Sequence, residues 1–263
     1  MNILLETAIK SAIAAGAEIM KIYGESFEVT LKSDHSPLTI ADENANAIIN
    51  TFLSKTDIPI ISEENKQTDY STRAKWETCW MVDPLDGTKE FIKRNGEFTV
   101  NIALIKNNKP VLGVIYVPVS NTLYYAMVSD QKAYKITLDA HCYTAEIHSK
   151  AKEELVPLRE ASNKIKVVAS RSHLNADTTE FIAHLKQQGN QVTLVSIGSS
   201  LKFCLVAEGK ATIYPRFAPT MEWDTAAGHA ICKAVGLKVM QVADAEELHY
   251  NKTQLLNPYF IVK

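Results

Sequence analysis

The chain has 263 residues, of which 46% are hydrophobic and 22% are charged, and its formal net charge is −2. These values describe an ordinary globular protein, long enough for one large domain or two fused subdomains. The near-neutral charge gives no support for duplex nucleic-acid binding, which needs a basic surplus. A small phosphorylated substrate needs only a local basic pocket, so the net charge leaves that class open.

No run of the sequence reaches the roughly 18 to 20 apolar residues that span a bilayer, and the N-terminus lacks a basic leader. We therefore expect a cytoplasmic protein, with peripheral inner-membrane association left open. The cysteines Cys79, Cys142, Cys204 and Cys232 lie far apart, each in or near an apolar run. This pattern predicts buried free thiols, not a disulfide framework or a zinc site.

The first part of the chain predicts two helices followed by a strand-rich region. Apolar residues have helical spacing over 2–23 and over about 41–54, which places Asp42 in the first turn of the second helix. Alternation over 27–32 is typical of a half-buried strand. Further strands, whose short connections favour a largely antiparallel sheet, are expected at 77–82, 97–106, 110–118 and 122–128.

Residues 139–163 are polar and irregular, so we expect a soft subdomain boundary there. It divides one compact unit into 1–155, with most metal ligands, and 156–263, with no flexible linker between them. Beyond the boundary strands and helices alternate, which predicts an α/β half. The expected strands are 165–169, 191–195, 211–214 and 237–241, and the expected helices are 176–187, 200–208 and 224–235.

The most informative segment is 80–88, where an apolar run delivers Asp83 and Asp86 into a tight turn that opens into a helix near Thr88. Gly87 permits backbone angles that other residues avoid. Two neighbouring carboxylates repel unless a cation lies between them, and N–H groups at a helix start attract an anion. The segment indicates metal-assisted phosphate chemistry, although Asp-Pro-x-Asp-Gly is also ordinary turn chemistry.

Acids at three other places lie at the edges of apolar segments, where sites commonly form. They are Asp42, the pair Glu63 and Glu64, and Asp224. Structural alternatives stay open, because Asp42, Asp224 and also Thr88 could serve only as helix caps. Glu64 could support a metal ligand or be solvated.

Together these residues resemble the lithium-sensitive, magnesium-dependent phosphatase superfamily of inositol monophosphatase. Segments 32–42, 83–99, 170–173 and 198–209 are similar to its CysQ-type 3′(2′),5′-bisphosphate nucleotidases, and Lys89-Glu90-Phe91 replaces the Thr-Asn-Phe typical of inositol monophosphatases. The resemblance covers nearly the whole chain. It implies an α+β or α/β fold, a layered α-β-α-β-α sandwich of the inositol monophosphatase and fructose-1,6-bisphosphatase type, with the active site between its halves.

The resemblance also implies a metal site. The carboxylates of Glu63, Asp83, Asp86 and Asp224, with the backbone carbonyl of Leu85, are expected to bind two or three Mg²⁺ ions. Mn²⁺ is a substitute, because oxygen ligands favour hard cations.

In the implied mechanism the catalytic residues are Asp42, Glu63 and Thr88. Glu63 and Thr88 orient a metal-bound water that attacks phosphorus in line, and Asp42 holds Thr88 through a hydrogen bond. A second ion neutralises the leaving ribose oxygen, while N–H groups of Gly87 and Thr88 hold the phosphate.

The second phosphate of the substrate needs cations away from the metals, for which Lys89, Arg171, Lys202 and Arg216 are candidates. A surface or structural role is the alternative for each of them. The full set of expected substrate-binding residues is Leu85, Asp86, Gly87, Thr88, Lys89, Ser170, Arg171, His173, Ser199, Lys202, Arg216 and Asp224.

The expected reaction is hydrolysis of adenosine 3′,5′-bisphosphate to AMP and phosphate by a 3′(2′),5′-bisphosphate nucleotidase. 3′-Phosphoadenosine 5′-phosphosulfate is a further candidate substrate, in sulfur assimilation. An inositol or sugar phosphatase of the same fold is the alternative enzyme, and a non-catalytic metal and nucleotide sensor is the alternative of another class. The expected assembly is a monomer or a homodimer.

Overall fold

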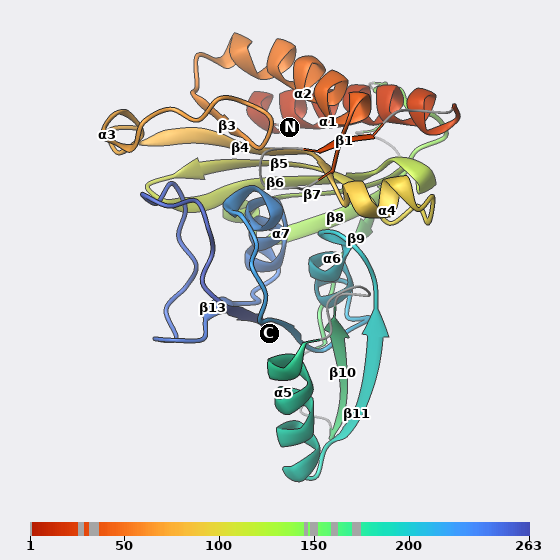
Figure 1. The fold of residues 1–263 in the computed structure, drawn as a ribbon, viewed down its shortest axis with the longest axis vertical. Helices are drawn as coiled ribbons and strands as arrows, with labels where there is room; N and C mark the ends of the chain where they lie inside the picture. The colour runs from red at the N-terminus through yellow and green to blue at the C-terminus, as the bar shows by residue number, and fades with distance from the viewer. Residues whose placement is uncertain are drawn as a thin grey trace.

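The computed structural model describes residues 2–25, 29–31, 37–144, 147, 152–158, 163–169 and 175–263, and their helices and sheets are stacked in layers (Figure 1). The helices are α1 (Ile3–Tyr23), α2 (Ile40–Leu53), α3 (Tyr70–Arg73), α4 (Thr88–Ile92), α5 (Ala176–Gln187), α6 (Leu201–Ala207) and α7 (Glu222–Ala234). The strands are β1 (Val29–Leu31), β2 (Pro37–Thr39), β3 (Ile60–Ser62), β4 (Thr78–Asp86), β5 (Thr99–Lys106), β6 (Lys109–Val117), β7 (Thr122–Met127), β8 (Lys132–Thr137), β9 (Glu153–Glu154), β10 (Lys164–Ala169), β11 (Gln191–Ser196), β12 (Tyr214–Arg216), β13 (Val239–Gln241) and β14 (Phe260–Val262).

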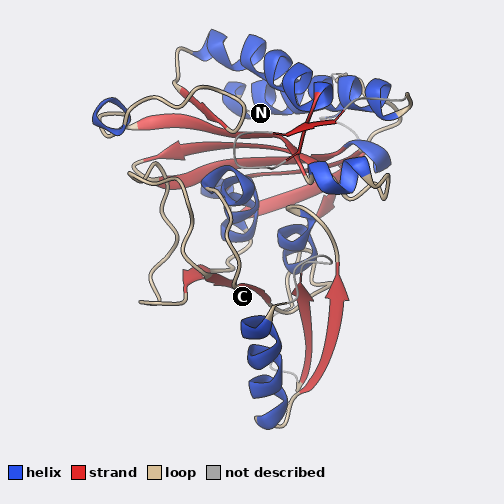
Figure 2. Ribbon diagram, viewed as in Figure 1, coloured by secondary structure: helices blue, strands red, loops and turns tan. Residues whose placement is uncertain are grey.

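The large sheet has the order β3-β4-β5-β6-β7-β8-β9 and separates two layers of helix. Helices α1 and α2 pack on one face, and α7 packs on the other (Figures 1 and 2). Beyond α6 and α7 lies a second group of strands, with α5 outside it. The layered α-β-α-β-α sandwich implied by the resemblance is therefore confirmed.

The strands of the large sheet are apolar on both faces because helices cover both faces. In β4, Trp80 and Val82 join the core formed with α1 and α2. The alternate residues Cys79 and Met81 join the core formed with α7. Side chains of a strand point alternately to its two faces, so this continuous apolar run belongs to two cores at once.

The second group of strands differs from the predicted α/β pattern. Strands β10 and β11 are parallel, as an α/β unit requires. Strands β12, β14 and β13 pair antiparallel, and a bridge between Val167 and Ile213 links the two parts. The prediction was wrong here because β14 comes from the last residues of the chain, which carry no local signal of their partner.

Most other predicted elements are confirmed within one or two residues, including the helices over 2–23, 41–54 and 176–187 and the strands over 97–106, 110–118 and 122–128. The strand expected at 77–82 is β4, which continues to Asp86. The strand expected at 211–214 was misplaced, since β12 begins at Tyr214. The strand expected over 27–32 is described only at its centre, 29–31. The sequence missed α3, β2, β3, β8, β9 and β14, which are short or contain lysine, glutamate or tyrosine.

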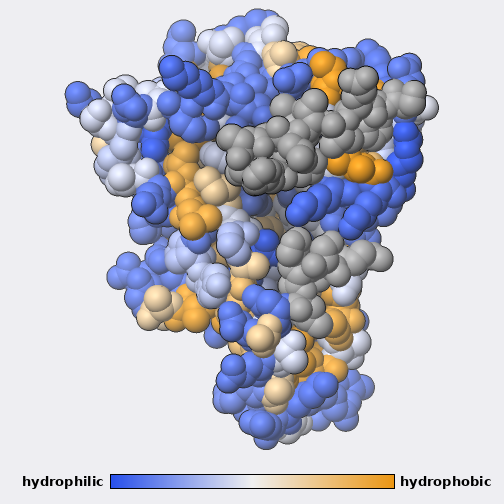
Figure 3. All heavy atoms as spheres, in the orientation of Figure 1, coloured by the Kyte–Doolittle hydropathy of each residue, from blue (hydrophilic) through white to orange (hydrophobic). Residues whose placement is uncertain are grey.

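Three of the four cysteines are buried free thiols, as predicted, but Cys142 is exposed. No helix among the described residues combines the length and apolarity needed to cross a bilayer. The surface seen in Figure 3 is mostly hydrophilic, with hydrophobic residues at several separate places. Scattered exposed apolar residues of this kind are normal for a folded protein.

The contact between α7 and the large sheet depends on a glycine. At Gly113 in β6, an added Cβ would overlap the carbonyl oxygen of Ala227 and lie 2.8 Å from the Cβ of Ala230. The helix backbone thus rests directly on the strand. Any side chain at this position must push α7 away from the sheet.

We expect Gly113→Ala to destabilise the protein by about 1–3 kcal/mol, because the obstructing atoms belong to a helix backbone and cannot rotate away. Chemical denaturation measures the change. Gly24→Ala is the matched control, since its Cβ would meet nothing closer than 3.4 Å. Equal stability of the two variants would contradict this account of the packing.

Candidate active site

Two parallel strands place the first two acids of the site. Strands β3 and β4 run side by side in parallel, with Ser62 opposite Val82. The next residues, Glu63 and Asp83, therefore emerge at the same edge of the sheet. The N-terminal turn of α7 brings Asp224 to this edge, and carboxylate oxygens of these three acids lie within 4.8 Å of one another.

A β-bulge directs the fourth acid to the same place. Pairing of β4 with β5 shifts by one residue between Asp83, which faces Asn101, and Asp86, which faces Thr99. A bulge of this kind re-aims the following side chain. Pro84 and Leu85 occupy the extra length, so the sequence Asp-Pro-Leu-Asp places both aspartates on the site side of the strand.

Buried polar side chains hold Asp86 in this position. The Oδ1 atom of Asn101 accepts hydrogen bonds from Thr99 Oγ1 at 3.0 Å and Ser200 Oγ at 2.8 Å. Its Nδ2 group is thereby directed to Asp86 Oδ2, at 3.3 Å. Thr99, Asn101 and Ser200 are all buried. Thr99 and Asn101 lie in β5, and Ser200 directly precedes α6. The sequence analysis missed them, because a short polar residue gives no signal until its partner is known.

Burial, together with the charges of neighbouring acids, raises the pKa values of Asp83, Asp86 and Asp224. Burial raises the pKa of Asp83 well above its usual value, and the neighbouring charge of Glu63 raises it further. Burial also raises the pKa of Asp224, with Asp86 adding to the effect, and it raises the pKa of Asp86 to about 6. A divalent cation would remove this repulsion, and an all-oxygen donor set suits a hard cation. The residues therefore fit a metal site.

Asp42 and Thr88 form the hydrogen bond that the resemblance implied. Thr88 Oγ1 donates to Asp42 Oδ1 at 3.0 Å. The other oxygen of Asp42 accepts from the N–H of Thr39 at 2.8 Å and from its hydroxyl at 2.7 Å. Asp42 is thus both a helix-capping residue and the partner of Thr88, so the capping alternative and the expected contact are compatible. Their catalytic roles stay predictions.

The turn between β4 and α4 requires a glycine. Gly87 has φ of +92°, a left-handed conformation that favours glycine. Leu85, on the same turn, donates its N–H to Asp83 Oδ1 at 3.1 Å. Its carbonyl oxygen accepts from Thr88 Oγ1 at 3.3 Å, a long hydrogen bond that leaves a lone pair for another partner.

A cavity of about 130 Å³ adjoins the acids. The acids Asp86 and Asp224 line it, together with Gly87 and the expected residue Ser199, which has φ of +44°. Lys89 reaches the cavity from an exposed position. The complete lining is Asp86, Gly87, Lys89, Glu90, Gly198, Ser199, Ser200, Lys202, Phe203, Tyr214, Arg216, Thr220, Asp224 and Thr225.

Besides the exposed Lys89, the cations Lys202 and Arg216 line this cavity. Among the described residues, both donate hydrogen bonds to backbone carbonyl groups. Lys202 is 5% exposed, and its ammonium donates to the carbonyl oxygens of Ser199 and Ile197. Burial lowers the pKa of Lys202 to about 8; Asp86 opposes this shift, and Arg216 adds to it. Arg216 donates to the carbonyl of Pro219 at 3.0 Å, while its buried Nε has no hydrogen-bond partner within the part of the chain that the structure describes.

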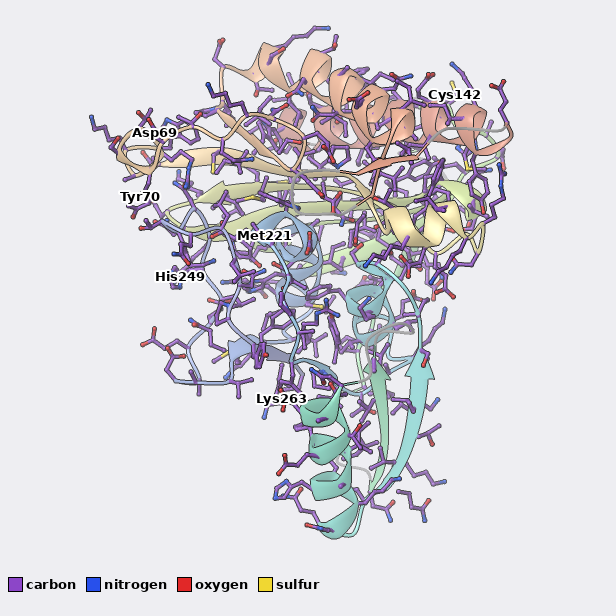
Figure 4. All side chains as sticks on the ribbon, in the orientation of Figure 1. Asp69, Tyr70, Cys142, Met221, His249 and Lys263 are labelled. Atoms are coloured by element: carbon purple, nitrogen blue, oxygen red, sulfur yellow. The ribbon has the colours of Figure 1, made fainter. Side chains whose placement is uncertain are left out.

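The first turn of α7, which carries Asp224, is held by a buried polar network. Glu222 is fully buried and accepts hydrogen bonds from the N–H groups of Asn251 and Lys252 and from the ammonium of Lys252 at 2.6 Å. Arg73 supports this loop by donating to Asn251 Oδ1 at 2.6 Å. Figure 4 labels Met221, which precedes α7 and lies at the junction between the large sheet and the second half of the chain.

The expected residues thus fall into two groups. Asp42, Glu63, Asp83, Leu85, Asp86, Gly87, Thr88 and Asp224 come together around the acids, and Lys89, Ser199, Lys202 and Arg216 line the adjoining cavity. Ser170, Arg171 and His173 lie outside the described residues. Glu90, Glu97 and Tyr214 also lie at or beside this cavity and were not expected; the Oε2 atom of Glu97 accepts from the N–H of Gly198 at 2.8 Å.

Comparison with known proteins adds independent information. The sequence profile of the "Inositol monophosphatase family" matches residues 2–259. The "3′(2′),5′-bisphosphate nucleotidase CysQ" of Salmonella typhimurium is 46% identical to this chain, with 98% of this chain and 99% of that protein covered. The CysQ of Escherichia coli K12 is 44% identical with the same coverage. A crystal structure of CysQ from Bacteroides thetaiotaomicron, 52% identical, superposes with a TM-score of 0.87 and covers 99% of this chain and 96% of that one.

We expect the metal-free protein to lose stability as the pH rises. Folding raises the pKa of Asp86 to about 6, above the usual value of about 3.9. Its stabilising contribution is therefore complete below about pH 4 and is lost as the pH rises through 6. The loss amounts to roughly 3 kcal/mol for this group, and Asp83 and Asp224, whose pKa values are also raised, extend it to higher pH.

Thermal unfolding with EDTA and with saturating Mg²⁺ measures this effect, at about pH 5.5 and about pH 7.5. The rise in Tm on adding Mg²⁺ should be larger at the higher pH, because the cation neutralises carboxylates that are then ionised. Asp86→Asn should weaken this pH dependence, while the exposed control Asp177→Asn should preserve it. A Tm that is identical with EDTA and with Mg²⁺ at both pH values would count against a metal site.

Proposed function

The chain belongs to the inositol monophosphatase family, and from this we propose that it is a metal-dependent phosphatase that hydrolyses adenosine 3′,5′-bisphosphate to AMP and phosphate. Family membership alone does not identify the substrate, but one observation supports a substrate with two phosphates. The acids Asp86 and Asp224 share a single cavity with the buried Lys202 and the half-buried Arg216. A substrate with two phosphates would match this set, with one phosphate at metal ions held by the acids and the other at the cations. The full-length similarity to CysQ proteins, which are 3′(2′),5′-bisphosphate nucleotidases, supports the same substrate.

Members of this family depend on metal ions, and Mg²⁺ is our proposal for the ion. Two or three ions would be held by Glu63, Asp83, Asp86 and Asp224 with the Leu85 carbonyl. Mn²⁺ has similar ligand preferences and is the expected substitute. When bound, such ions supply Lewis acidity and lower the pKa of coordinated water.

The protein residues supply orientation. Asp42 fixes the hydroxyl of Thr88 through the 3.0 Å hydrogen bond. The carbonyl oxygen of Leu85, one of the proposed metal ligands, lies 3.3 Å from that hydroxyl oxygen. Glu63 and Thr88 would together orient the attacking water toward phosphorus, and N–H groups of Gly87 and Thr88 would hold the phosphate oxygens.

The second phosphate would bind to Lys202 and Arg216. Both groups lie in the cavity that the metal ligands line. The buried Nε of Arg216, which meets no acceptor among the residues that the structure describes, supports an anionic partner, because a buried donor without an acceptor is costly. Lys89 and Ser199 would contribute from the wall, and from the sequence the proposal also retains Ser170, Arg171 and His173. 3′-Phosphoadenosine 5′-phosphosulfate carries the same pair of anionic ends and is a further proposed substrate.

The first experiment compares phosphate release from adenosine 3′,5′-bisphosphate and from inositol 1-phosphate, each with Mg²⁺ and with EDTA. We expect Mg²⁺-dependent turnover that favours the nucleotide, since inositol 1-phosphate has no second phosphate for the cation pair. An equal or better rate on inositol 1-phosphate would make the protein an inositol phosphatase. Binding of the nucleotide without turnover would make it a non-catalytic sensor.

Removing one cation should affect only substrates with a second phosphate. For Arg216→Gln we expect kcat/KM for adenosine 3′,5′-bisphosphate to fall about 10- to 100-fold, the cost of losing a hydrogen bond to a charged group. The rate on adenosine 3′-monophosphate should be little changed. Lys186→Gln, at an exposed position on α5, is the control for a simple loss of charge. Equal losses on both substrates would contradict the assignment of Arg216.

A further inference from the structure

The segment Lys89-Glu90-Phe91 contains one residue that neither packing nor the proposed chemistry explains. Phe91 is fully buried against Tyr23 and Phe98. Lys89 is exposed at the cavity and is a candidate phosphate partner. Glu90 is half-buried and lines the same cavity, although that cavity is proposed to bind a doubly phosphorylated substrate.

Glu90 lies next to two glycines of the cavity wall. A Cβ added at Gly198 would lie 2.8 Å from Glu90 Cγ, so the stem of the side chain rests on this glycine. A Cβ added at Gly87 would lie 3.4 Å from Glu90 Oε2, so the carboxylate points toward Gly87. Gly87 directly follows Asp86, and Gly198 precedes Ser199, whose carbonyl binds Lys202. Glu90 therefore lies beside the chain neighbours of both a proposed metal ligand and a hydrogen-bond partner of Lys202.

The carboxylate of Glu90 is available to a ligand. Among the described residues it makes no hydrogen bond and no ion pair, although it interacts electrostatically with Lys202. A carboxylate can only accept hydrogen bonds. It would repel either phosphate of the substrate, so its natural partner is a hydrogen-bond donor that lies between the two phosphates.

We propose that Glu90 determines specificity by accepting a hydrogen bond from the free ribose hydroxyl of a nucleoside bisphosphate. This inference rests on the proposed function. With the 3′-phosphate at the metal ligands and the 5′-phosphate at Lys202 and Arg216, the part of the substrate between them is the ribose. Its 2′-hydroxyl is a donor next to the phosphate that is cleaved. Glu90 thus distinguishes ribonucleotides from deoxyribonucleotides.

The test compares kcat/KM for adenosine 3′,5′-bisphosphate and its 2′-deoxy counterpart with saturating Mg²⁺. The wild-type protein should favour the ribonucleotide by about 10- to 100-fold, the value of a hydrogen bond to a charged acceptor. Glu90→Ala should bring the ratio close to one. Glu90→Gln keeps the shape and a neutral acceptor, so its ratio should be intermediate. Glu180→Gln, an exposed acid on α5, should retain the wild-type ratio.

Two results would overturn the inference while leaving the proposed function intact. One is turnover of both nucleotides by the wild-type protein at equal rates, a measurement that needs no variant. The other is a Glu90→Ala protein that slows both substrates by the same factor, which indicates that Glu90 only supports α4. If the wild-type protein hydrolyses neither nucleotide but does hydrolyse inositol 1-phosphate, the proposed function fails, and the role of Glu90 fails with it.

Discussion

The mutual repulsion of four carboxylates is the constraint on which the rest of this structure depends. Asp83 and Asp224 have oxygens within 4.8 Å of each other and of Glu63, and Asp86 adds a further charge in the same buried place. In a low-dielectric environment such charges drive each other apart. The backbone must therefore be fixed independently of the acids. Parallel pairing of β3 with β4, the bulge in β4 and the direct seating of α7 on Gly113 provide that rigidity.

A consequence of this repulsion is that hydrogen bonds from other parts of the chain stabilise the positions of the acids. Asn101 on β5 is oriented by two hydroxyls so that its amide donates to Asp86. Glu222 is anchored by the loop after β13, which fixes the turn of α7 that carries Asp224. These groups are satisfied within the protein, so they hold the acids without competing for a cation. A preformed site of this kind binds an ion without reorganising, at the cost of stability when the ion is removed.

The cavity beside the acids places further charged groups where a substrate would bind. Its acids would become a phosphate site once divalent ions bind, and Lys202 and Arg216 line the same cavity. Glu90 lines it as a hydrogen-bond acceptor. In our proposal these groups match the phosphate, hydroxyl and phosphate of a nucleoside bisphosphate. Discrimination against an inositol monophosphate would then follow from the unfilled cation pair, without any change in the metal ligands.

The sequence by itself determined the helices of the first half, most strands of the large sheet and the turn at 83–88, because hydrophobic period and turn residues are local properties. It also identified the residues around the acids, through motifs that contain them. Tertiary structure alone decided that β14 pairs between β12 and β13. Tertiary structure alone also brought Asn101, Ser200 and Glu222 into the hydrogen bonds that hold the acids in place, and it placed Glu90 in the lining of the cavity. The role of a polar side chain depends on its hydrogen-bond partner. That partner can lie 99 residues away, as for Asn101 and Ser200, or 178 residues away, as for Arg73 and Asn251, where no local pattern records it.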